Sequence, residues 1–255
     1  MNRLLIFFFS IVFIGCCNEK KVLNNGLTKQ ATKITEYTIK SINDSLNNKI
    51  QDTLVITELK YNENDQIIKR FQQNLFAEGT MEIDFVYNKN KKIEREIVKM
   101  STDSLPLIVN YYYNDSLLNQ TKSLFENDSE KFEQIESHYY GKNNKIEKKI
   151  LSQVFVDKES TDTITNSETI SFFNKNEFTE KTETINHKDL KRNTKTEFKY
   201  DCETLIKTLD YNYQDSLIST TVYKYQLDKF DNWIKKESFE NDKLNYIKTR
   251  EIEYK

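Results

Sequence analysis

Apolar and polar residues alternate along most of the chain after residue 33. In MEIDFVY, residues 81–87, Met81, Ile83, Phe85 and Tyr87 alternate with mostly polar neighbours. The segment EFKY at residues 197–200 has the same alternation. A period of two residues is typical of a β-strand with one apolar and one polar face, so the pattern predicts an all-β protein.

The strand-like stretches end in aromatic residues that recur along the chain, each followed by a polar turn. The series is Tyr61, Tyr87, Tyr113, Tyr140, Phe173, Tyr200 and Tyr225, and its steps are 26, 26, 27, 33, 27 and 25 residues. The long step contains DKESTDTITNSE, a polar stretch that indicates an enlarged loop. A sustained period near 26 residues predicts a repeat architecture.

One period has room for two strands of about eight to ten residues and two short turns, which is an antiparallel hairpin. Successive hairpins predict a meander of roughly 14 to 16 strands. Rows such as Glu94 and Glu96, or Lys235 and Glu237, should face water, and the aromatic face must find cover. The pattern leaves open whether the sheet curls into a barrel, a half-barrel or a solenoid-like sheet.

The turns should be built on asparagine. The chain has only 4 Gly and 1 Pro but many Asn residues. Asn tolerates the left-handed backbone conformation that many turns need, so we expect it to replace glycine there.

Composition narrows the class of protein further. The 15 Tyr and 16 Phe, many at fixed spacing, supply the area for burial that disordered chains lack. A net charge of -2 and the absence of a basic patch argue against a nucleic-acid partner. The three cysteines, with Cys17 and Cys202 far apart, argue against a disulfide framework.

The N-terminus has the pattern of an export signal, with Arg3 followed by an apolar run from Leu4 to Ile14. This run is too short to cross a bilayer, which takes about 20 residues in a helix. The sequence Phe-Ile-Gly-Cys that ends at Cys16 resembles the lipobox of bacterial lipoproteins, although the family prefers an aliphatic residue at its first position. The resemblance implies that Cys16 becomes the acylated first residue, with Cys17 as the second choice.

This resemblance predicts a lipid-anchored protein that carries palmitate or a similar acyl chain and lies on a membrane. The expected division is a signal peptide at residues 1–15, an anchor and flexible linker at 16–32, and a β-hairpin repeat domain at 33–255. No aspartate follows the acylated cysteine directly, which in Gram-negative lipoproteins favours the outer membrane. Only Glu19 represents the acidic cluster of surface-exported lipoproteins, so the periplasmic and the surface face both remain open.

The C-terminal stretch YKYQLDKFDNWIKK, residues 223–236, resembles the YD-type (RHS-like) repeats of secreted and surface bacterial proteins. In that family a Tyr-Asp pair ends a strand and a Gly-Asn pair makes the turn. Only Tyr200 and Asp201 keep the pair intact here, and Asp231 stands in place of the turn glycine. The resemblance implies a β-hairpin array that serves as a shell or binding surface.

No constellation of catalytic, cofactor-binding or metal-binding residues is recognisable. His138 and His187 are the only histidines, and neither has a cysteine or carboxylate at ligand spacing. We expect both to be solvated. No Gly-rich phosphate loop, nucleophile elbow or HExxH motif occurs, so we predict no cofactor and no enzymatic activity.

One short motif, Asp followed by Ser or Thr and an aliphatic residue, recurs at positions expected to be turns. Its hydroxyl residues are Ser45, Thr53, Ser104, Ser116, Thr163 and Ser216. Asp and Ser favour turns by bonding their own backbone, which explains the motif without function. The motif also looks like an acceptor for O-glycosylation on exported proteins of some Gram-negative bacteria.

These observations predict a non-catalytic lipoprotein of the outer membrane that serves as a binding or scaffold module. Its partners would be the membrane, through the lipid anchor, and a protein, glycan or apolar ligand. One alternative is a carrier that holds an apolar ligand in a curved, aromatic-lined sheet, and another is a hydrolase. An unfilled interior would favour a carrier and a filled core a scaffold.

Overall fold

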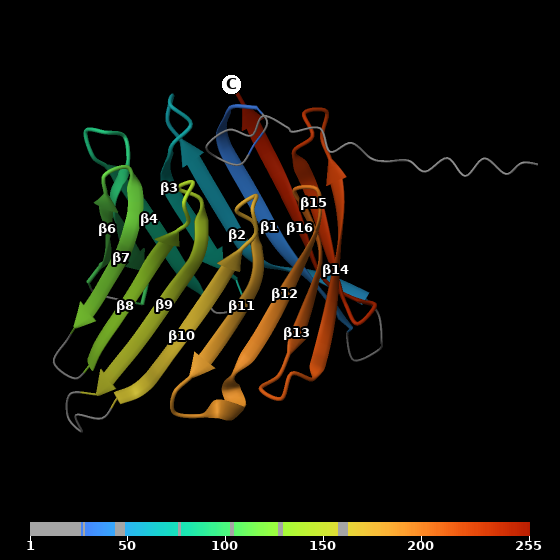
Figure 1. Cartoon of the computed structure of the whole chain (residues 1–255). Coiled ribbons are helices and arrows are strands. Elements are labelled where there is room, and N and C mark those ends of the chain that lie inside the picture. The colour runs from blue at the N-terminus through green and yellow to red at the C-terminus, as the bar shows by residue number, and fades with distance from the viewer. Residues whose placement is uncertain are drawn as a thin grey trace, which may run out of the picture.

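The computed structural model describes residues 27, 29–43, 49–75, 78–102, 105–126, 130–157 and 163–255. These residues form sixteen antiparallel strands that follow one another around a closed barrel (Figure 1). The strands are β1 (Ala31–Asn43), β2 (Lys49–Tyr61), β3 (Ile67–Asn74), β4 (Gly79–Tyr87), β5 (Ile93–Met100), β6 (Leu107–Asn114), β7 (Leu117–Glu126), β8 (Glu130–Tyr140), β9 (Ile146–Asp157), β10 (Thr163–Phe173), β11 (Thr179–Asn186), β12 (Thr194–Asp201), β13 (Thr204–Tyr211), β14 (Leu217–Leu227), β15 (Trp233–Glu240) and β16 (Lys243–Tyr254). A short 3₁₀ helix, η1 (Leu190–Arg192), precedes β12. The predicted all-β meander is therefore confirmed, and of the three closures left open it is the barrel.

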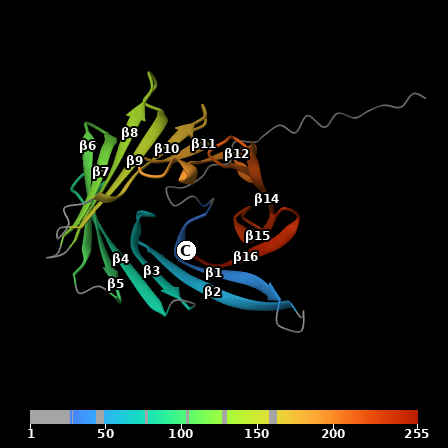
Figure 2. The same ribbon diagram turned by 90° about the horizontal axis from the view of Figure 1, so that it is seen from below.

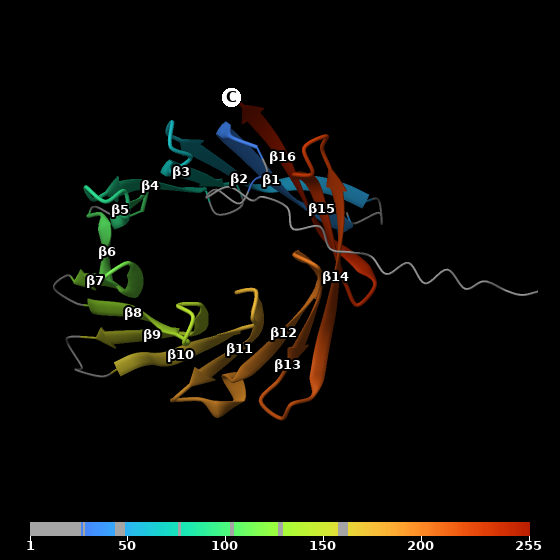
Figure 3. The ribbon, with the colours of Figure 1, turned by 45° about the horizontal axis from the view of Figure 1, so that its top comes forward.

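Pairing of the first strand with the last closes the ring. The register of β1 and β16 places Ile34 opposite Ile252 and Glu36 opposite Arg250. Figure 3 shows these two strands side by side, the blue strand beside the red one. Every strand thus has two neighbours, and the sheet has no open edge.

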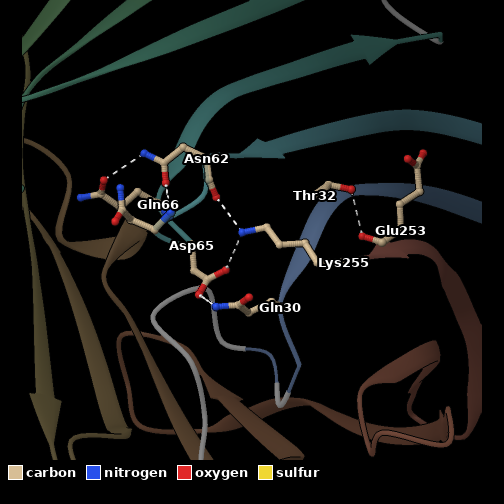
Figure 4. Close-up of polar contacts among 8 residues, drawn as sticks. Gln30, Thr32, Asn62, Asp65, Gln66, Glu253 and Lys255 are labelled. Carbon is tan, nitrogen blue, oxygen red and sulfur yellow. Dashed lines mark hydrogen bonds and ion pairs between the residues drawn. The ribbon is translucent and has the colours of Figure 1, made fainter.

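A cluster of polar contacts fastens this closure at the rim where the chain ends (Figure 4). The ammonium group of Lys255 contacts the backbone carbonyl of Asn62 at 3.1 Å and a carboxylate oxygen of Asp65 at 3.4 Å. The side-chain amide of Gln30 donates to the other Asp65 oxygen at 2.8 Å. The turn between β2 and β3 therefore binds both the residue before β1 and the residue after β16.

The two faces of the sheet differ in burial, which identifies the inner one. Side chains crowd on the concave side of a curved sheet and spread on its convex side. One face holds the buried strand residues Ile34, Ile83, Val98, Ser123, His138, Thr208 and Ser238, whereas the other holds Thr35 and Ile247. The first is the inner face. It carries, in strand order from β1 to β16, Glu36, Thr57, Gln72, Ile83, Glu96, Val109, Ser123, Gln134, Gln153, Ser167, Thr182, Thr196, Asp210, Thr221, Lys236 and Lys248.

Among the residues that the structure describes, side chains do not fill the interior of the barrel. The apolar core of the described residues is local: Leu27, Ala31 and Ile34 pack with four partly buried neighbours, Leu59, Tyr61, Ile252 and Tyr254. Most other inner side chains are only half-buried. Barrels of eight strands are just wide enough to be filled by side chains, and those of 16 to 18 leave an aqueous space. We conclude that water reaches the inner face.

The repeating aromatic residues lie at one rim and connect successive hairpins. The hydroxyl of Tyr113 donates to the carbonyl of Ile93 at 2.9 Å, and that of Tyr225 donates to the carbonyl of Leu205 at 2.8 Å. The ring of Tyr200 instead stacks on Phe178, with centroids 5.2 Å apart. The aromatic residues recur in the sequence because each hairpin uses one of them to contact the previous hairpin.

Asparagine shapes the turns, but by a different mechanism from the expected one. The side-chain oxygen of Asn88 accepts hydrogen bonds from the backbone N–H groups of Asn90 at 2.9 Å and Lys92 at 3.1 Å. The same pair of bonds recurs at Asn62, Asn174, Asn212 and Asp228. The left-handed position falls mostly on other residues, such as Lys91 with a φ of 61°. Asn is thus used here mainly as a side-chain acceptor.

Candidate functional site in the barrel interior

The outer face of the barrel carries charged side chains in pairs at mid-height. Lys69 on β3 lies 2.9 Å from Glu82, and Lys235 on β15, four strands away around the ring, lies 2.8 Å from Glu237. Further outer pairs are Lys99–Asp84, Lys122–Glu133, Lys181–Glu183 and Lys199–Glu197. Such exposed pairs contribute about 0–1 kcal/mol each to stability, so their main effect is to make this face polar.

Polar side chains, most of them uncharged, line the inner face from β8 to β14. The hydroxyls of Thr169 and Thr184 lie 3.3 Å apart, and the amide of Gln153 donates to Gln134 at 2.9 Å. Asp210 accepts hydrogen bonds from the hydroxyls of Thr196 at 2.7 Å and Ser219 at 2.8 Å. This wall is therefore hydrophilic, and the expectation of an aromatic face closed away from water is wrong here.

Carboxylates gather on the inner face between β5 and β8. Glu96 accepts a hydrogen bond from Tyr111, and Glu136 lies 2.7 Å from the ring nitrogen of His138. Burial, together with the bond to Glu96, raises the pKa of Tyr111 well above its ordinary value. Glu96 was expected on the outer face. Glu96 faces inward because the β4–β5 register shifts by one residue between the pairs Val86–Arg95 and Tyr87–Ile93.

The two histidines differ in environment. His138 is buried, with 7% of its surface exposed, and the expectation that it would be solvated is wrong. His138 faces inward on β8, beside Glu136. The hydrogen bond between them is the main reason why the pKa of the Glu136 carboxyl lies below its ordinary value. His187 is exposed in the connection after β11, as expected.

Cations dominate the inner face where the barrel closes. We call the group of Lys236 on β15, Lys248 and Arg250 on β16, and Glu36 on β1 the basic arc. The ammonium group of Lys248 contacts one oxygen of Glu36 at 2.9 Å, and Nε of Arg250 contacts the other at 3.0 Å. The one carboxylate of the basic arc therefore pairs with two of its three cations.

The charges of the basic arc shift one another's protonation. Burial alone would raise the pKa of Glu36, but the bond to Lys248 and the charges of Lys248 and Arg250 hold that pKa below its ordinary value. Burial and the positive charges of Lys248 and Arg250 lower the pKa of Lys236, against the opposing effect of Glu36. Beside Lys248 and Arg250, a third positive charge on Lys236 is therefore disfavoured.

Lys236 has aromatic neighbours but no carboxylate of its own. Its ammonium group lies 4.2 Å from the ring centroid of Tyr223 and 5.6 Å from that of Tyr225. No ion pair joins it to a carboxylate of the residues described above. Such cation–π contacts contribute about 0.5–2 kcal/mol, less than full pairing of a desolvated charge would.

Further aromatic and polar groups surround the basic arc. The guanidinium of Arg250 lies over the ring of Trp233, 3.4 Å from its centroid. Within the described part of the chain, two buried polar atoms on this side of the barrel lack a hydrogen-bond partner, Nε of Arg70 on β3 and the hydroxyl of Ser238 on β15. These atoms are unused donors on the wall that also carries the excess of cations.

The residues named from the sequence as modification sites fall in different places. Ser116 and Ser216 are exposed in turns, as expected. Thr53 lies within β2 and Thr163 is the first residue of β10, so the expectation that all these sites are in turns or loops is wrong for them. Cys16, Cys17, Ser45 and Ser104 lie outside the described residues.

The remaining cysteine, Cys202, occupies the turn between β12 and β13 and is disulfide-bonded. The expectation from the sequence concerned a framework of several disulfides, and one bonded cysteine does not test it.

The described residues contain neither a metal-binding cluster nor a membrane-spanning helix. No group of three or more His, Cys, Asp or Glu side chains among them is arranged to hold a metal ion. No helix among them has the length and hydrophobicity needed to cross a membrane.

The sequence contains one weak signal of the basic arc. Lys248 and Arg250 are two residues apart on a strand, which places both on the same face. The contribution of Glu36 had no local signal, because it comes from the other end of the chain. Only the β1–β16 register brings it to Arg250.

Comparisons with known proteins define the class of fold. No family model matches the sequence, and no curated protein matches it. The barrel is similar to the crystal structure of a porin-like protein from Bacteroides vulgatus, with a TM-score of 0.51, 12% identity, and coverage of 89% of this chain and 99% of that one. It is also similar to a porin-like protein from Bacteroides uniformis, with a TM-score of 0.54, 9% identity, and coverage of 88% and 96%. At such identities the likeness shows the fold: this is a sixteen-stranded, porin-like β-barrel.

Proposed function

We propose that the protein is a non-catalytic binding module of the cell envelope, whose barrel stands in water and takes a polar ligand in its interior. The observation that carries this proposal is the polarity of both faces. The outer face has ion pairs at mid-height and the inner face has hydroxyl, amide and charged groups.

The outer face argues against contact with lipid. A transmembrane barrel presents an apolar band about 25 Å tall to the hydrocarbon, and one Lys or Arg at its midplane costs about 2–4 kcal/mol. Here Lys122 on β7 and Lys235 on β15 lie within strands on opposite parts of the ring. The similarity to porin-like proteins is therefore one of fold, and we propose that this barrel does not span the membrane.

The inner face supports a polar ligand better than an apolar one. An apolar carrier needs a dry, hydrocarbon-lined cavity. Here Thr169, Thr184 and Gln153 make this wall of the interior polar. The charged groups on either side of this wall would fix the orientation of a polar solute. An alternative carrier of an apolar ligand has no comparable support.

The lipid anchor completes the proposal, with Cys16 as the acylated residue and Cys17 as the second choice, and with the outer membrane as the place of attachment. The support is the sequence at residues 13–16 together with the porin-like fold, which fits an envelope protein. An acyl anchor would hold a water-facing barrel at a membrane without a spanning segment.

Detergent phase partitioning of the acylated protein and of Cys16→Ser, Cys17→Ser and double variants tests this proposal. We expect the native protein in the detergent phase with labelled palmitate, and the unacylated variant in the aqueous phase with its far-ultraviolet spectrum unchanged. An unacylated barrel that stays in the detergent phase would show that its outer face contacts lipid. Retained palmitate in the double variant would exclude the proposed anchor.

A further inference from the structure

Resting on the proposed function, we infer that the basic arc is a binding site for a small multivalent anion with carboxylate or phosphate oxygens. The site would consist of Lys236, Lys248 and Arg250, with Glu36 holding two of the three cations in place. No sequence motif marks it, because it is assembled from β15, β16 and β1.

The first argument is the imbalance of charge. Partly desolvated cations are stable when each has a counter-charge, and one left unpaired costs free energy. Arg250 has 21% and Glu36 16% of its side-chain surface exposed, so this wall is substantially withdrawn from solvent. With Lys248 and Arg250 on the single carboxylate, Lys236 has none. An added anion would supply the missing negative charge.

The second argument is the supply of donors. Arg250 uses Nε for Glu36, and its fork of terminal nitrogens makes no other hydrogen bond with the described residues. A planar fork of this kind matches the oxygens of a carboxylate or phosphate. Lys236 adds a donor that can rotate toward the ligand. The unpartnered Nε of Arg70 lies farther along the same wall and extends the positive region.

The third argument is the distribution of charge around the ring. Glu136 on β8 lies halfway round the barrel from β16, and Glu96 on β5 lies five strands from β16 (Figure 2). Glu136 is paired with Lys149 at 3.5 Å, so Glu96 is the carboxylate that would repel an anion there and direct it to the basic arc. The interior thus favours anions at one defined place.

The position of Trp233 provides a direct measurement. It is the only tryptophan of the chain, and its ring lies against the guanidinium of Arg250. An anion that draws the guanidinium toward itself would change the surroundings of the ring and therefore its fluorescence.

The test is titration of the purified full-length protein in mild detergent, at low salt and near pH 7, with pyrophosphate, citrate or glucose. Tryptophan fluorescence and calorimetry would follow binding. We expect saturable binding of pyrophosphate, citrate or both, and none of glucose. Preference for one anion assigns the site to phosphate or to carboxylate chemistry. Absence of binding of either anion overturns the inference.

Two variants on neighbouring positions give a matched control. Lys236→Met removes an inward cation, and Lys235→Met removes the adjacent outward one, which pairs with Glu237. We expect Lys236→Met to weaken anion binding about tenfold or more, and Lys235→Met to leave it within about twofold. An equal effect of the two variants would mean that the anion follows overall charge, which contradicts a site.

A stability measurement separates a binding role from a structural one. Because Lys236 is crowded by like charges, methionine in its place should leave the melting temperature unchanged or raise it while anion binding is lost. A lower melting temperature together with lost binding would show that Lys236 supports the barrel. The partitioning experiment above is independent of these titrations, so a water-facing barrel that binds no anion would refute this inference alone.

Discussion

The hydroxyl of Tyr87, at the end of β4, donates a hydrogen bond to the backbone carbonyl of Ile67, at the start of β3, over 2.7 Å. Tyr140 makes the corresponding bond to the carbonyl of Leu118 at 2.9 Å. Burial raises the pKa of the Tyr87 hydroxyl above its ordinary value, so it stays protonated and able to donate. Each such bond fastens one hairpin to the one before it.

Tyr87→Phe removes this bond and keeps the ring. We expect a loss of about 1 kcal/mol in the free energy of unfolding, because one intramolecular hydrogen bond contributes about that much. Tyr112→Phe is the control, since Tyr112 faces outward and is 48% exposed. Urea titrations of both variants give the comparison, and equal losses would contradict the role assigned to Tyr87.

The turns offer a second test of how the hairpins are held. Asn88→Ala deletes the oxygen that accepts from the N–H groups of Asn90 and Lys92, and we expect it to lower stability by about 1 kcal/mol. Asn90→Ala lies in the same turn but keeps the backbone donor, so it should change stability by less than about 0.5 kcal/mol. Thermal unfolding of the two variants would show the difference.

Glu36 links stability to pH. Its pKa in the folded protein is lowered from 4.5, so its contribution is complete above that value and is lost as the pH falls through the lower folded pKa. Glu36→Gln should cost about 2 kcal/mol at neutral pH and flatten the loss of stability below pH 4.5. Glu183→Gln, in an exposed pair with Lys181, should do neither. An unchanged acid profile in Glu36→Gln would exclude the basic arc as its origin.

Closure of the ring predicts cooperative unfolding. If the hairpins were a linear array, Trp233 near the C-terminal end would lose its environment early in urea. Because β16 pairs with β1, the last hairpin is not an end, and we expect Trp233 fluorescence and the far-ultraviolet signal to change in one transition. An early, separate Trp233 transition would indicate that the β1–β16 contact is weak.

The hydroxyl motif predicts glycosylation where the chain is accessible. Ser116 and Ser216 are exposed in turns, so we expect protein from the native host to carry a repeated glycan mass at these residues and none at Thr53 within β2. Mass spectrometry of the intact protein and of Ser116→Ala and Ser216→Ala variants would test this. If only the mass of the acylated chain is found, the residues are not glycosylated and the motif only favours turns.

The strands and the repeat could be predicted because their signals are local. Alternation in residues 81–87 specifies a strand, and the aromatic residue that ends it recurs because each one bonds the preceding hairpin. The inward orientation of Glu96 and His138 could not be predicted from the alternation of apolar and polar residues. A single bulge reverses which side chains face inward, and the sequence does not mark where the bulges fall.

Closure and the basic arc could not be predicted because they depend on contacts between distant residues. Nothing near Glu36 indicates that Arg250 will lie opposite it, and a half-barrel would have satisfied the same hairpin pattern. The choice of the barrel depends on the register of one strand pair. The composition of the interior follows from that choice.

The pairing of β1 with β16 also has a consequence for how the chain folds. Every other strand pair joins neighbours in the sequence, whereas contacts such as that of Thr32 with Glu253 span 221 residues. Hairpins form in about 1–10 μs and can assemble in order along the chain, but closure must wait until β16 is in place. Until then β1 and the growing end present open edges that can pair with other chains. A chain truncated before β16 would therefore form an open sheet prone to aggregation, and the twelve residues of β16 convert it into a ring.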